Sequence, residues 1–440
     1  MTKLTPTVLA MALCAASLSA FGQTPPPRDA VIYEPETRDP ALKEIKERNE
    51  SEDAAAATAT AAIRKQQEAE AKAKKESKKV LRATLSETAL PGPPEGFKQV
   101  YHAPPQAQFY TGTCWAFAAT SFLESEIFRT TGQKVKMSEM HTVYWEYVEK
   151  ARRFVRQRGA SHFAEGSEHN AVTRIWSLYG AVPLDAYAGL RQEDGRHDHL
   201  RLAQEMEEFL AFVKAKNRWD EEWVLTALRT ILDRHLGPPP SEFTYDGRKY
   251  TPRSFLEKVA RIEPTDYVGF MSTMAHPFYQ QAEFEVADNW WHDASYHNVP
   301  LDRFVAAIDG AIRNGYSMAI GGDVSEPGKN FRQDIAFVPT FDIPGDYIDQ
   351  SAREYRINNG SSGDDHGIHL VGVRDVGNHS WYLIKDSGRS ARHGKFDGYY
   401  FFRDDFVKLK MLTFMVHKDG VKGLLDEFKK ADEVDQKAAK

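Results

Sequence analysis

Apolar side chains recur at helical spacing between Cys114 and Phe128, where the chain reads Cys-Trp-Ala-Phe-Ala-Ala-Thr-Ser-Phe-Leu-Glu-Ser-Glu-Ile-Phe. This spacing predicts a helix, and Gly112-Thr113 just before it suits a turn that leads into the helix N-terminus. The same periodicity predicts further helices over about residues 138–157, 170–179, 199–214 and 220–235.

The pattern changes toward the C-terminus. Three short segments rich in β-branched and aromatic residues, 367–374, 380–385 and 398–403, are separated by turn residues. They predict antiparallel strands. Helices that come first and strands that come later are typical of an α+β protein.

Residues 23–95 differ in composition from the rest of the chain. A proline run opens this stretch, Ala, Glu and Lys dominate its middle, and Pro91-Gly-Pro-Pro94 ends it. Because it has almost no large apolar residues, we expect a solvated linker or exposed helix, with a pro-segment as the functional alternative. We expect residues 96–418 to form the globular domain and residues 419–440 to form a charged tail.

The first 22 residues have the pattern of a secretory signal peptide. Lys3 lies in a short positive region, residues 7–18 are apolar, and residues 19–22 offer small side chains for cleavage. The apolar run is too short for a membrane span. The bulky Leu13 before Cys14 argues against a lipoprotein. We therefore expect an exported protein, periplasmic or extracellular, without stable membrane insertion.

Composition indicates a folded protein with a buried core, and the charge balance argues against nucleic-acid binding. Apolar residues make up 41% of the 440 residues and aromatic residues 12%, which is enough for a buried core. Lys and Arg total 57 against 63 Asp and Glu, so the formal net charge is −6. This balance gives no electrostatic footprint for nucleic acid.

The cysteine count singles out Cys114. The chain has 2 cysteines, and removal of a signal peptide that contains Cys14 would leave Cys114 alone, without a disulfide partner. Most free cysteines are small buried apolar residues. Cys114, however, falls at the N-terminus of the predicted helix, where backbone N–H groups and the helix dipole lower the pKa of a thiol.

A thiol nucleophile needs a histidine, which a third polar group must orient. His366 begins one predicted strand, and Asp386 follows the next strand. A short hairpin can place His366 and Asp386 side by side, with Cys114 contributed by the helix on the opposite wall. The residues therefore indicate a cysteine nucleophile.

The chain resembles papain-like cysteine peptidases, in particular the branch of bleomycin hydrolase and aminopeptidase C. Gln108 to Phe117 (Gln-Phe-Tyr-Thr-Gly-Thr-Cys-Trp-Ala-Phe), Asp365 to Val373 and Tyr382 to Gly388 are similar to the nucleophile, histidine and orienting segments. The segments 137–155, 243–255 and 299–324 are similar to the branch. The resemblance covers about residues 97–418 and implies a two-lobed α+β fold, with helical insertions at about residues 190–300.

The resemblance implies a role for each matching residue. Cys114 is the nucleophile, His366 rather than His369 is its partner, and Asp386 orients His366. The Gln108 amide and the Cys114 backbone N–H form the oxyanion hole. Gly166 and Ser167 pair with the substrate backbone, and Trp115 and Asp365 lie beside the substrate. The implied activity is peptide-bond hydrolysis on peptide or protein substrates, without a cofactor, and the branch also suggests aminopeptidase action.

Three features depart from the family pattern. The orienting residue is Asp386 where the family has Asn, and Gly388 stands where the family tends to have a shielding Trp. The C-terminal Gln-Lys-Ala-Ala-Lys does not match the arm that reaches the cleft in the aminopeptidase C branch. These departures leave open endopeptidase or exopeptidase action, substrate preference and the number of subunits.

Two alternatives compete with the peptidase. His366 and His369 form a His-x-x-His pair, but residues three apart on a strand point to opposite faces and chelate a metal poorly. No metal site is therefore predicted. The second alternative is an inactive papain-like protein that binds peptides in an inherited cleft. A reactive Cys114 thiol would distinguish a peptidase from such a binding protein.

Overall fold

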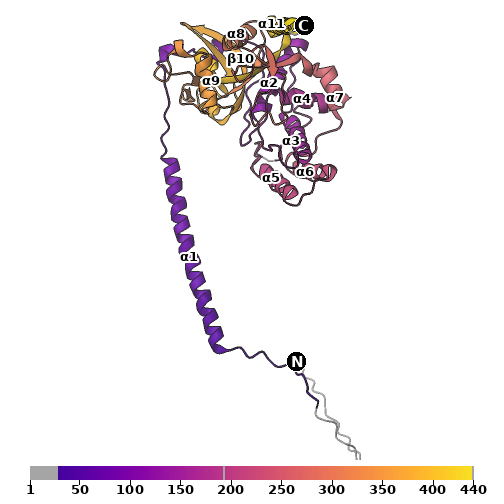
Figure 1. The fold of residues 1–440 in the computed structure, drawn as a ribbon, viewed down its shortest axis with the longest axis vertical. Coiled ribbons are helices and arrows are strands. Elements are labelled where there is room, and N and C mark those ends of the chain that lie inside the picture. Colours follow the sequence, from indigo (N-terminus) through magenta and orange to yellow (C-terminus); the bar gives the residue numbers. More distant parts are fainter. Residues whose placement is uncertain (1–27, 192–193, 439–440) are drawn as a thin grey trace, which may run out of the picture. The chain divides into compact units, whose positions relative to one another are not determined.

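A computed structural model describes residues 28–191 and 194–438 (Figure 1). The chain divides into two compact units, Met1–Val80 and Leu81–Lys440. The predicted signal peptide, residues 1–22, lies outside the described residues, so export stays a prediction. None of the described helices is long and apolar enough to span a membrane.

The first unit consists mainly of helix α1, Pro40–Glu76. Asp39 caps it by accepting a hydrogen bond from the Ala41 backbone N–H at 2.9 Å, and Pro40 occupies the first helical position. None of its side chains is buried. Ion pairs at a spacing of four residues, such as Lys43–Glu47 and Lys72–Glu76, lie on its surface. The expected exposed helix is therefore present.

The second unit contains the other helices and all the described strands. Its helices are α2 (Cys114–Thr131), α3 (Glu139–Arg156), α4 (Asn170–Tyr179), α5 (Leu200–Ala215), α6 (Glu221–Leu236), α7 (Pro252–Phe255), α8 (Leu301–Arg313), α9 (Gln350–Asn358), α10 (Asp404–Lys410) and α11 (Lys422–Ala438). The helices expected from periodicity match α2 to α6 to within two or three residues.

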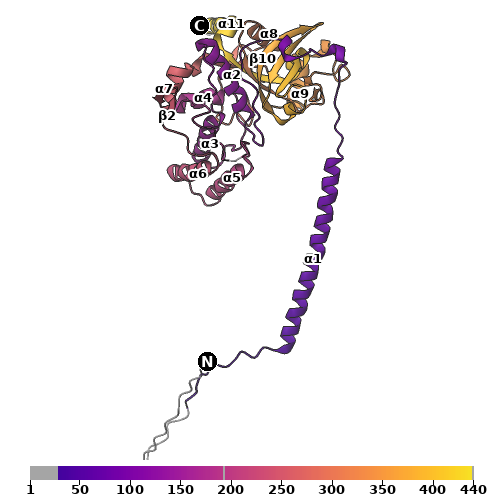
Figure 2. The same ribbon diagram turned by 180° about the vertical axis from the view of Figure 1, so that it is seen from behind.

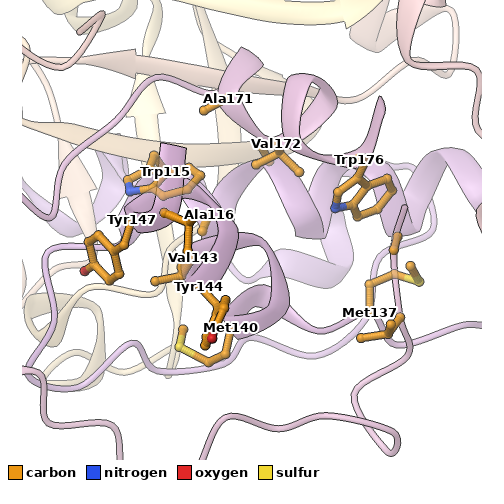
Figure 3. Packing of buried hydrophobic residues seen from close by; sticks show 14 of the residues in the cluster. Trp115, Ala116, Met137, Met140, Val143, Tyr144, Tyr147, Ala171, Val172 and Trp176 are labelled. Atoms are coloured by element: carbon orange, nitrogen blue, oxygen red, sulfur yellow. The ribbon is translucent and has the colours of Figure 1, made fainter. Parts of the chain in front are cut away.

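Helix α2 is the centre of a mainly helical lobe. One apolar cluster joins it to α3, α4, α5 and α6, and the side chains of Trp115 and Trp176 are almost fully buried there (Figure 3). The indole N–H of Trp176 donates to the Thr142 hydroxyl at 3.0 Å, so the polar atom of this buried side chain is satisfied. This packing fixes the N-terminus of α2.

The strands form one large sheet and a small hairpin. They are β1 (Lys98–Gln99), β2 (Phe243–Tyr245), β3 (Arg248–Tyr250), β4 (Tyr267–Met271), β5 (Gln280–Ala282), β6 (Tyr296–Asn298), β7 (Met318–Gly322), β8 (Lys329–Asn330), β9 (Ile335–Ala336), β10 (His366–Val376), β11 (His379–Lys385), β12 (Tyr399–Arg403) and β13 (Met411–His417). The large sheet has the order β5-β6-β4-β13-β7-β10-β11-β12-β9-β8, with β1 beside β10. The three predicted strands match β10, β11 and β12.

Figure 1 shows helices α3 to α6 gathered on one side of this unit and the sheet, with α8 and α9, on the other; Figure 2 shows the same division from behind. A second apolar cluster fills the sheet side and includes Phe270, Phe304 and Phe414. The architecture is a two-lobed α+β fold, which confirms the predicted fold class.

Both ends of the second unit pack onto the sheet side. Before β1, the Ala83 backbone N–H donates to the Pro327 carbonyl at 2.9 Å. Near the C-terminus, Leu424 and Phe428 of α11 are buried in the second apolar cluster. The compact unit thus begins at Leu81, earlier than the Pro/Gly cluster, and the charged tail includes a helix with an apolar face. A linker or pro-segment role for residues 23–95 stays a prediction.

Candidate active site

Cys114 is the first residue of α2, as the sequence predicts. The preceding Thr113 has a non-helical backbone, and its carbonyl accepts the first helical hydrogen bonds from Ala116 and Phe117. The backbone N–H of Cys114 therefore lies among the groups at a helix start that have no acceptor within the helix. The thiol is free and partly exposed. These features suit a nucleophile that develops negative charge.

His366, the first residue of β10, lies between Cys114 and Asp386. Its Nε2 is 2.8 Å from Oδ1 of Asp386, and the Cys114 thiol lies close enough to raise the pKa of its ring. Burial alone would lower the pKa of His366, but the Asp386 carboxylate and the Cys114 thiol raise it to about 10. The structure thus brings together the predicted nucleophile, partner and orienting group. His369 instead bonds the Ser121 hydroxyl at 2.8 Å.

Asp386 follows β11, and sheet register explains its position. Strands β10 and β11 are antiparallel, with His369 opposite Lys385, so the start of β10 lies beside the end of β11. Asp386 is almost fully buried, and Gly388 donates its N–H to Oδ1 at 2.7 Å. Burial would raise the pKa of Asp386, but His366 and Lys329 hold it well below its ordinary value. The carboxylate is therefore an anion suited to orient an imidazolium.

Gln108 connects the two lobes beside this group. Its Nε2 donates to the Thr111 carbonyl at 2.8 Å, and its Oε1 accepts a hydrogen bond from the Ser387 hydroxyl at 2.7 Å. Its backbone N–H also donates to the Ser387 carbonyl at 3.0 Å. The amide is held on both sides, and one of its two N–H bonds remains for a ligand.

Helix α3 supports the segment that contains Gly166 and Ser167. Lys150 donates to the Ala164 carbonyl at 2.7 Å and to the Gly166 carbonyl. Ser167 donates its hydroxyl to the buried Glu146 carboxylate at 2.7 Å. The side chain of Ser167 therefore contacts the protein, and the backbone of this segment is the part that a substrate could pair with.

The other two predicted substrate contacts have partners within the protein. Trp115 is buried and donates its indole N–H to the Glu165 carbonyl at 3.0 Å. Asp365 accepts a hydrogen bond from the Val324 backbone N–H at 2.9 Å and another from the Ser325 hydroxyl. Trp115 thus fixes the 165–167 segment to α2, and Asp365 stabilises the turn after β7.

Three carboxylates near His366 were not singled out from the sequence. Glu168 is buried and accepts a hydrogen bond from the Tyr296 hydroxyl at 3.3 Å, Asp364 precedes His366 by two residues, and the Asp288 carboxylate fills the space that a Cβ at Gly166 would take. Burial and the nearby carboxylates of Asp288 and Asp365 raise the pKa of Asp364 to about 7. Burial and the carboxylates of Asp364 and Asp288 raise the pKa of Glu168 well above its ordinary value. We call Glu168, Asp288 and Asp364 the acidic cluster. The Asp364-Asp365 pair before His366 was the one sequence signal that could have pointed to it.

A cavity of about 610 Å³ adjoins Gln108. Residues of the 108–111 loop, of helix α5 and of two other segments line it: Gln108, Phe109, Tyr110, Thr111, Glu165, Leu200, Ala203, Gln204, Glu207 and Arg389. Its volume lies within the range typical of small-molecule and peptide sites. Helix α5, from the predicted insertion, therefore contributes to the surroundings of the active site.

Comparisons with known proteins place the chain in a family. The family model described as Peptidase C1-like family matches residues 164–437, which is more than half of the chain. The chain therefore belongs to the Peptidase C1-like family, whose members are cysteine peptidases and thus hydrolases. This confirms the family resemblance found in the sequence.

Among curated relatives, the chain is 26% identical over 261 residues to aminopeptidase C of Streptococcus thermophilus, a match that covers 49% of this chain and 58% of the relative. It is 22% identical over 210 residues to mitochondrial cysteine proteinase 1 of Saccharomyces cerevisiae, covering 38% and 44% respectively. The chain thus matches about half the length of these relatives. The crystal structure of PepW from Lactobacillus rhamnosis has the same fold, with a TM-score of 0.61, 18% identity and coverage of 77% of this chain and 85% of that one.

Proposed function

We propose that this protein hydrolyses peptide bonds with Cys114 as the nucleophile. The observation that carries this proposal is the position of His366, whose Nε2 lies 2.8 Å from the buried Asp386 carboxylate and whose pKa the nearby Cys114 thiol raises. Because Nε2 of His366 bonds Asp386, Nδ1 is the ring nitrogen left for the thiol. The family membership supports the same chemistry.

The proposed reaction has two steps. The Cys114 thiolate attacks the carbonyl carbon, the C–N bond breaks, and His366 gives its proton to the leaving amine. Water then attacks the thioester carbonyl and gives a proton to His366, and the C–S bond breaks. The carboxylic acid product leaves, and the Cys114 thiolate and protonated His366 are restored. The remaining N–H of Gln108 and the backbone N–H of Cys114 stabilise the oxyanion in each step, each typically contributing about 3 kcal/mol.

We further propose that the enzyme removes residues from peptide N-termini. One support is that the relative with 26% identity over 261 residues is named aminopeptidase C. The other is the acidic cluster, since carboxylates gathered close to His366 favour an ammonium group on the substrate. One buried oxygen of Glu168 and the buried Nε2 of His169 have no hydrogen-bond partner among the described residues. Both groups could serve a bound amine.

Hydrolysis of matched substrates tests both proposals. We expect an aminoacyl arylamide with a free amine to be cleaved, its N-acetylated analogue to be cleaved at least about tenfold more slowly, and Cys114→Ala to cleave neither. His379→Ala is the matched histidine control, because His379 bonds Asp404 at 2.8 Å and takes no part in the site. Equal cleavage of both substrates would contradict the aminopeptidase proposal and leave the peptidase proposal intact.

The acidic cluster has its own control pair. Asp364→Asn should raise KM for the free-amine substrate by about tenfold and leave the N-acetylated one unaffected. Asp365→Asn removes the neighbouring carboxylate, which stabilises a turn, and should not discriminate between the two substrates. No turnover of either substrate, with an unreactive Cys114 thiol, would instead favour the peptide-binding alternative.

We also propose that the protein acts outside the cytoplasm, on the basis of residues 1–22. Mass spectrometry of the protein isolated from its native cells should find a chain that begins near Gln23. A cytoplasmic protein that retains residues 1–22 would contradict export.

A further inference from the structure

The two oxygens of the Asp386 carboxylate have different partners. Oδ1 accepts hydrogen bonds from His366 Nε2 at 2.8 Å and from the Gly388 backbone N–H at 2.7 Å. Oδ2 lies 3.5 Å from Nζ of Lys329. Within residues 28–191 and 194–438, Lys329 is the one cation besides His366 at ion-pair distance from Asp386.

Burial makes this contact important. Asp386 is 1% exposed and Lys329 is 8% exposed. An uncompensated buried charge is unfavourable, so each of these two groups would lose its ionised form, or its position, without the other. The Lys329 ammonium also lies 4.5 Å from the centre of the Tyr400 ring, which supports the cation from a second side.

A segment far away in sequence holds the Lys329 loop in place. Arg82 donates to the Lys329 carbonyl at 3.1 Å, and the Asn330 side chain donates to the Ala83 carbonyl at 3.0 Å. Leu85 donates its backbone N–H to the Gln333 side chain at 3.0 Å and accepts from it at 2.8 Å. We call residues 82–85 the strap. It fixes the backbone from which Lys329 reaches Asp386.

We propose that Lys329 is a positioning residue, which keeps Asp386 ionised and oriented toward His366 and is itself held by the strap. This inference rests on the proposed function. It links the Asp386 departure from the family pattern to one lysine, since an Asn at this position would need no cation. It also assigns part of the stretch 23–95 a supporting contact with the site.

The charged and titratable groups that face Asp386 come from three strands. They are His366 of β10, Lys329 of β8 and Tyr400 of β12. Lys385, the last residue of β11, directly precedes Asp386 in the sequence. His366 is the thiol partner, whereas Lys329 contacts Asp386 without contacting Cys114 in any described interaction. Substitution of Lys329 therefore tests the support of Asp386 separately from the thiol partner.

The test is the rate of Cys114 alkylation by iodoacetamide from pH 4 to 9 in the full chain. We expect Lys329→Met to slow alkylation at pH 6 by about tenfold and to move the acidic limb of the profile upward by about one pH unit, because Asp386 then takes up a proton more readily. Lys329→Arg should recover most of the loss. Lys395→Met is the matched control, since it removes one exposed positive charge.

A double-mutant cycle separates this role from general damage. Asp386→Asn alone leaves Lys329 buried without its anion, whereas Lys329→Met with Asp386→Asn leaves a neutral pair. We therefore expect the double variant to alkylate faster than Asp386→Asn. The proposal would be overturned if the rate loss of the double variant lies within about twofold of the rate losses of Lys329→Met and Asp386→Asn multiplied together. A Lys329→Met profile that matches that of Lys395→Met would also overturn it.

Two further measurements keep the outcome interpretable. If Lys329→Met melts below the assay temperature, Arg82→Ala tests the same support through the strap. It should shift the profile in the same direction by a smaller amount, and an unshifted profile would contradict the proposal.

Alkylation needs no peptide substrate. If the chain cleaves no peptide but the double variant is alkylated faster than Asp386→Asn, the proposed function is refuted and this inference stands. If the chain cleaves peptides but the two substitutions act additively on alkylation, the proposed function stands and this inference is refuted.

Discussion

Gly388 lies so close to His366 that a Cβ at position 388 would fit only if its neighbours moved by a few tenths of an ångström. A Cβ at this residue would lie 3.2 Å from Nε2 of His366 and 3.0 Å from Oδ1 of Asp386. The backbone of Gly388 therefore covers the His366–Asp386 contact directly, at the position where the family tends to have Trp. Its N–H also bonds the carboxylate. In this chain the main chain takes over part of the shielding expected of an indole ring.

We expect Gly388→Ala to lower kcat/KM by about tenfold, because a small displacement of His366 misaligns the proton donor. Gly345→Ala is the matched control, since a Cβ there meets nothing within 4 Å. Steady-state hydrolysis of an aminoacyl arylamide by the two variants, with melting temperatures, gives the comparison. Full activity of Gly388→Ala would show that the site tolerates this displacement.

Cys114 should be alkylated faster than an ordinary thiol below neutral pH. At about pH 5.5 an ordinary thiol with a pKa near about 8.5 is only ~0.1% ionised, whereas a thiol paired with imidazolium remains reactive. We expect fast alkylation of the native chain at this pH and a loss of about a hundredfold in His366→Ala. Slow alkylation that His366→Ala does not change would remove the basis of the catalytic pair.

Stability should fall at alkaline pH. The pKa of His366 is raised from 6.5 to about 10 in the folded chain, so the folded state binds this proton more tightly than the unfolded state. This contribution to stability is complete below about pH 6.5 and is lost as the pH rises through about 10. Urea unfolding at several pH values from 6 to 10 should give a steeper decline for the native chain than for His366→Ala. Parallel declines would contradict this linkage.

Glu146 should be important for both stability and substrate binding. It is fully buried, and its carboxylate accepts hydrogen bonds from Ser167 at 2.7 Å and from Trp290 at 2.6 Å and pairs with Arg174. We expect Glu146→Gln to lower the free energy of unfolding by about 3–5 kcal/mol, because Arg174 loses its buried partner. KM should rise as the 164–168 segment loosens.

Glu149→Gln is the control for that change. Glu149 lies on the same helix, is partly exposed and pairs with Arg152 at 3.1 Å, so its loss should cost less than about 1 kcal/mol. Urea denaturation measures both variants. Equal effects would mean that Glu146 is no more important than a surface ion pair.

Local sequence signals predicted the long helices and the group around Cys114. Helix α4 begins and ends where the periodicity predicts, and His366 and Asp386 were selected because each borders a recognisable strand. Strands such as β7 and β13 were not predicted. Their pairing partners lie about 45 to 150 residues away in sequence, and periodicity within a short window carries no information about such partners.

Lys329 and the acidic cluster were missed for a related reason. Lys329 lies in a polar stretch and meets Asp386 only through the sheet, 57 residues away. A physical signal was nevertheless present: an Asp where the family has Asn adds a charge that needs a nearby cation once it is buried. Asp288 lies in a loop of the predicted insertion, and its carboxylate is beside Gly166. Hydrophobic periodicity did not predict the fold of that loop.

Helix α1 has a consequence for how unfolding would be observed. Since none of its side chains is buried, packing against a core does not stabilise it. Its circular dichroism signal should therefore fade gradually on warming, without the sharp transition of a packed domain. Ellipticity at 222 nm would begin to fall well before the enzyme loses any function. Calorimetry or residual turnover, rather than helix content, is the appropriate measure of this protein's thermal limit.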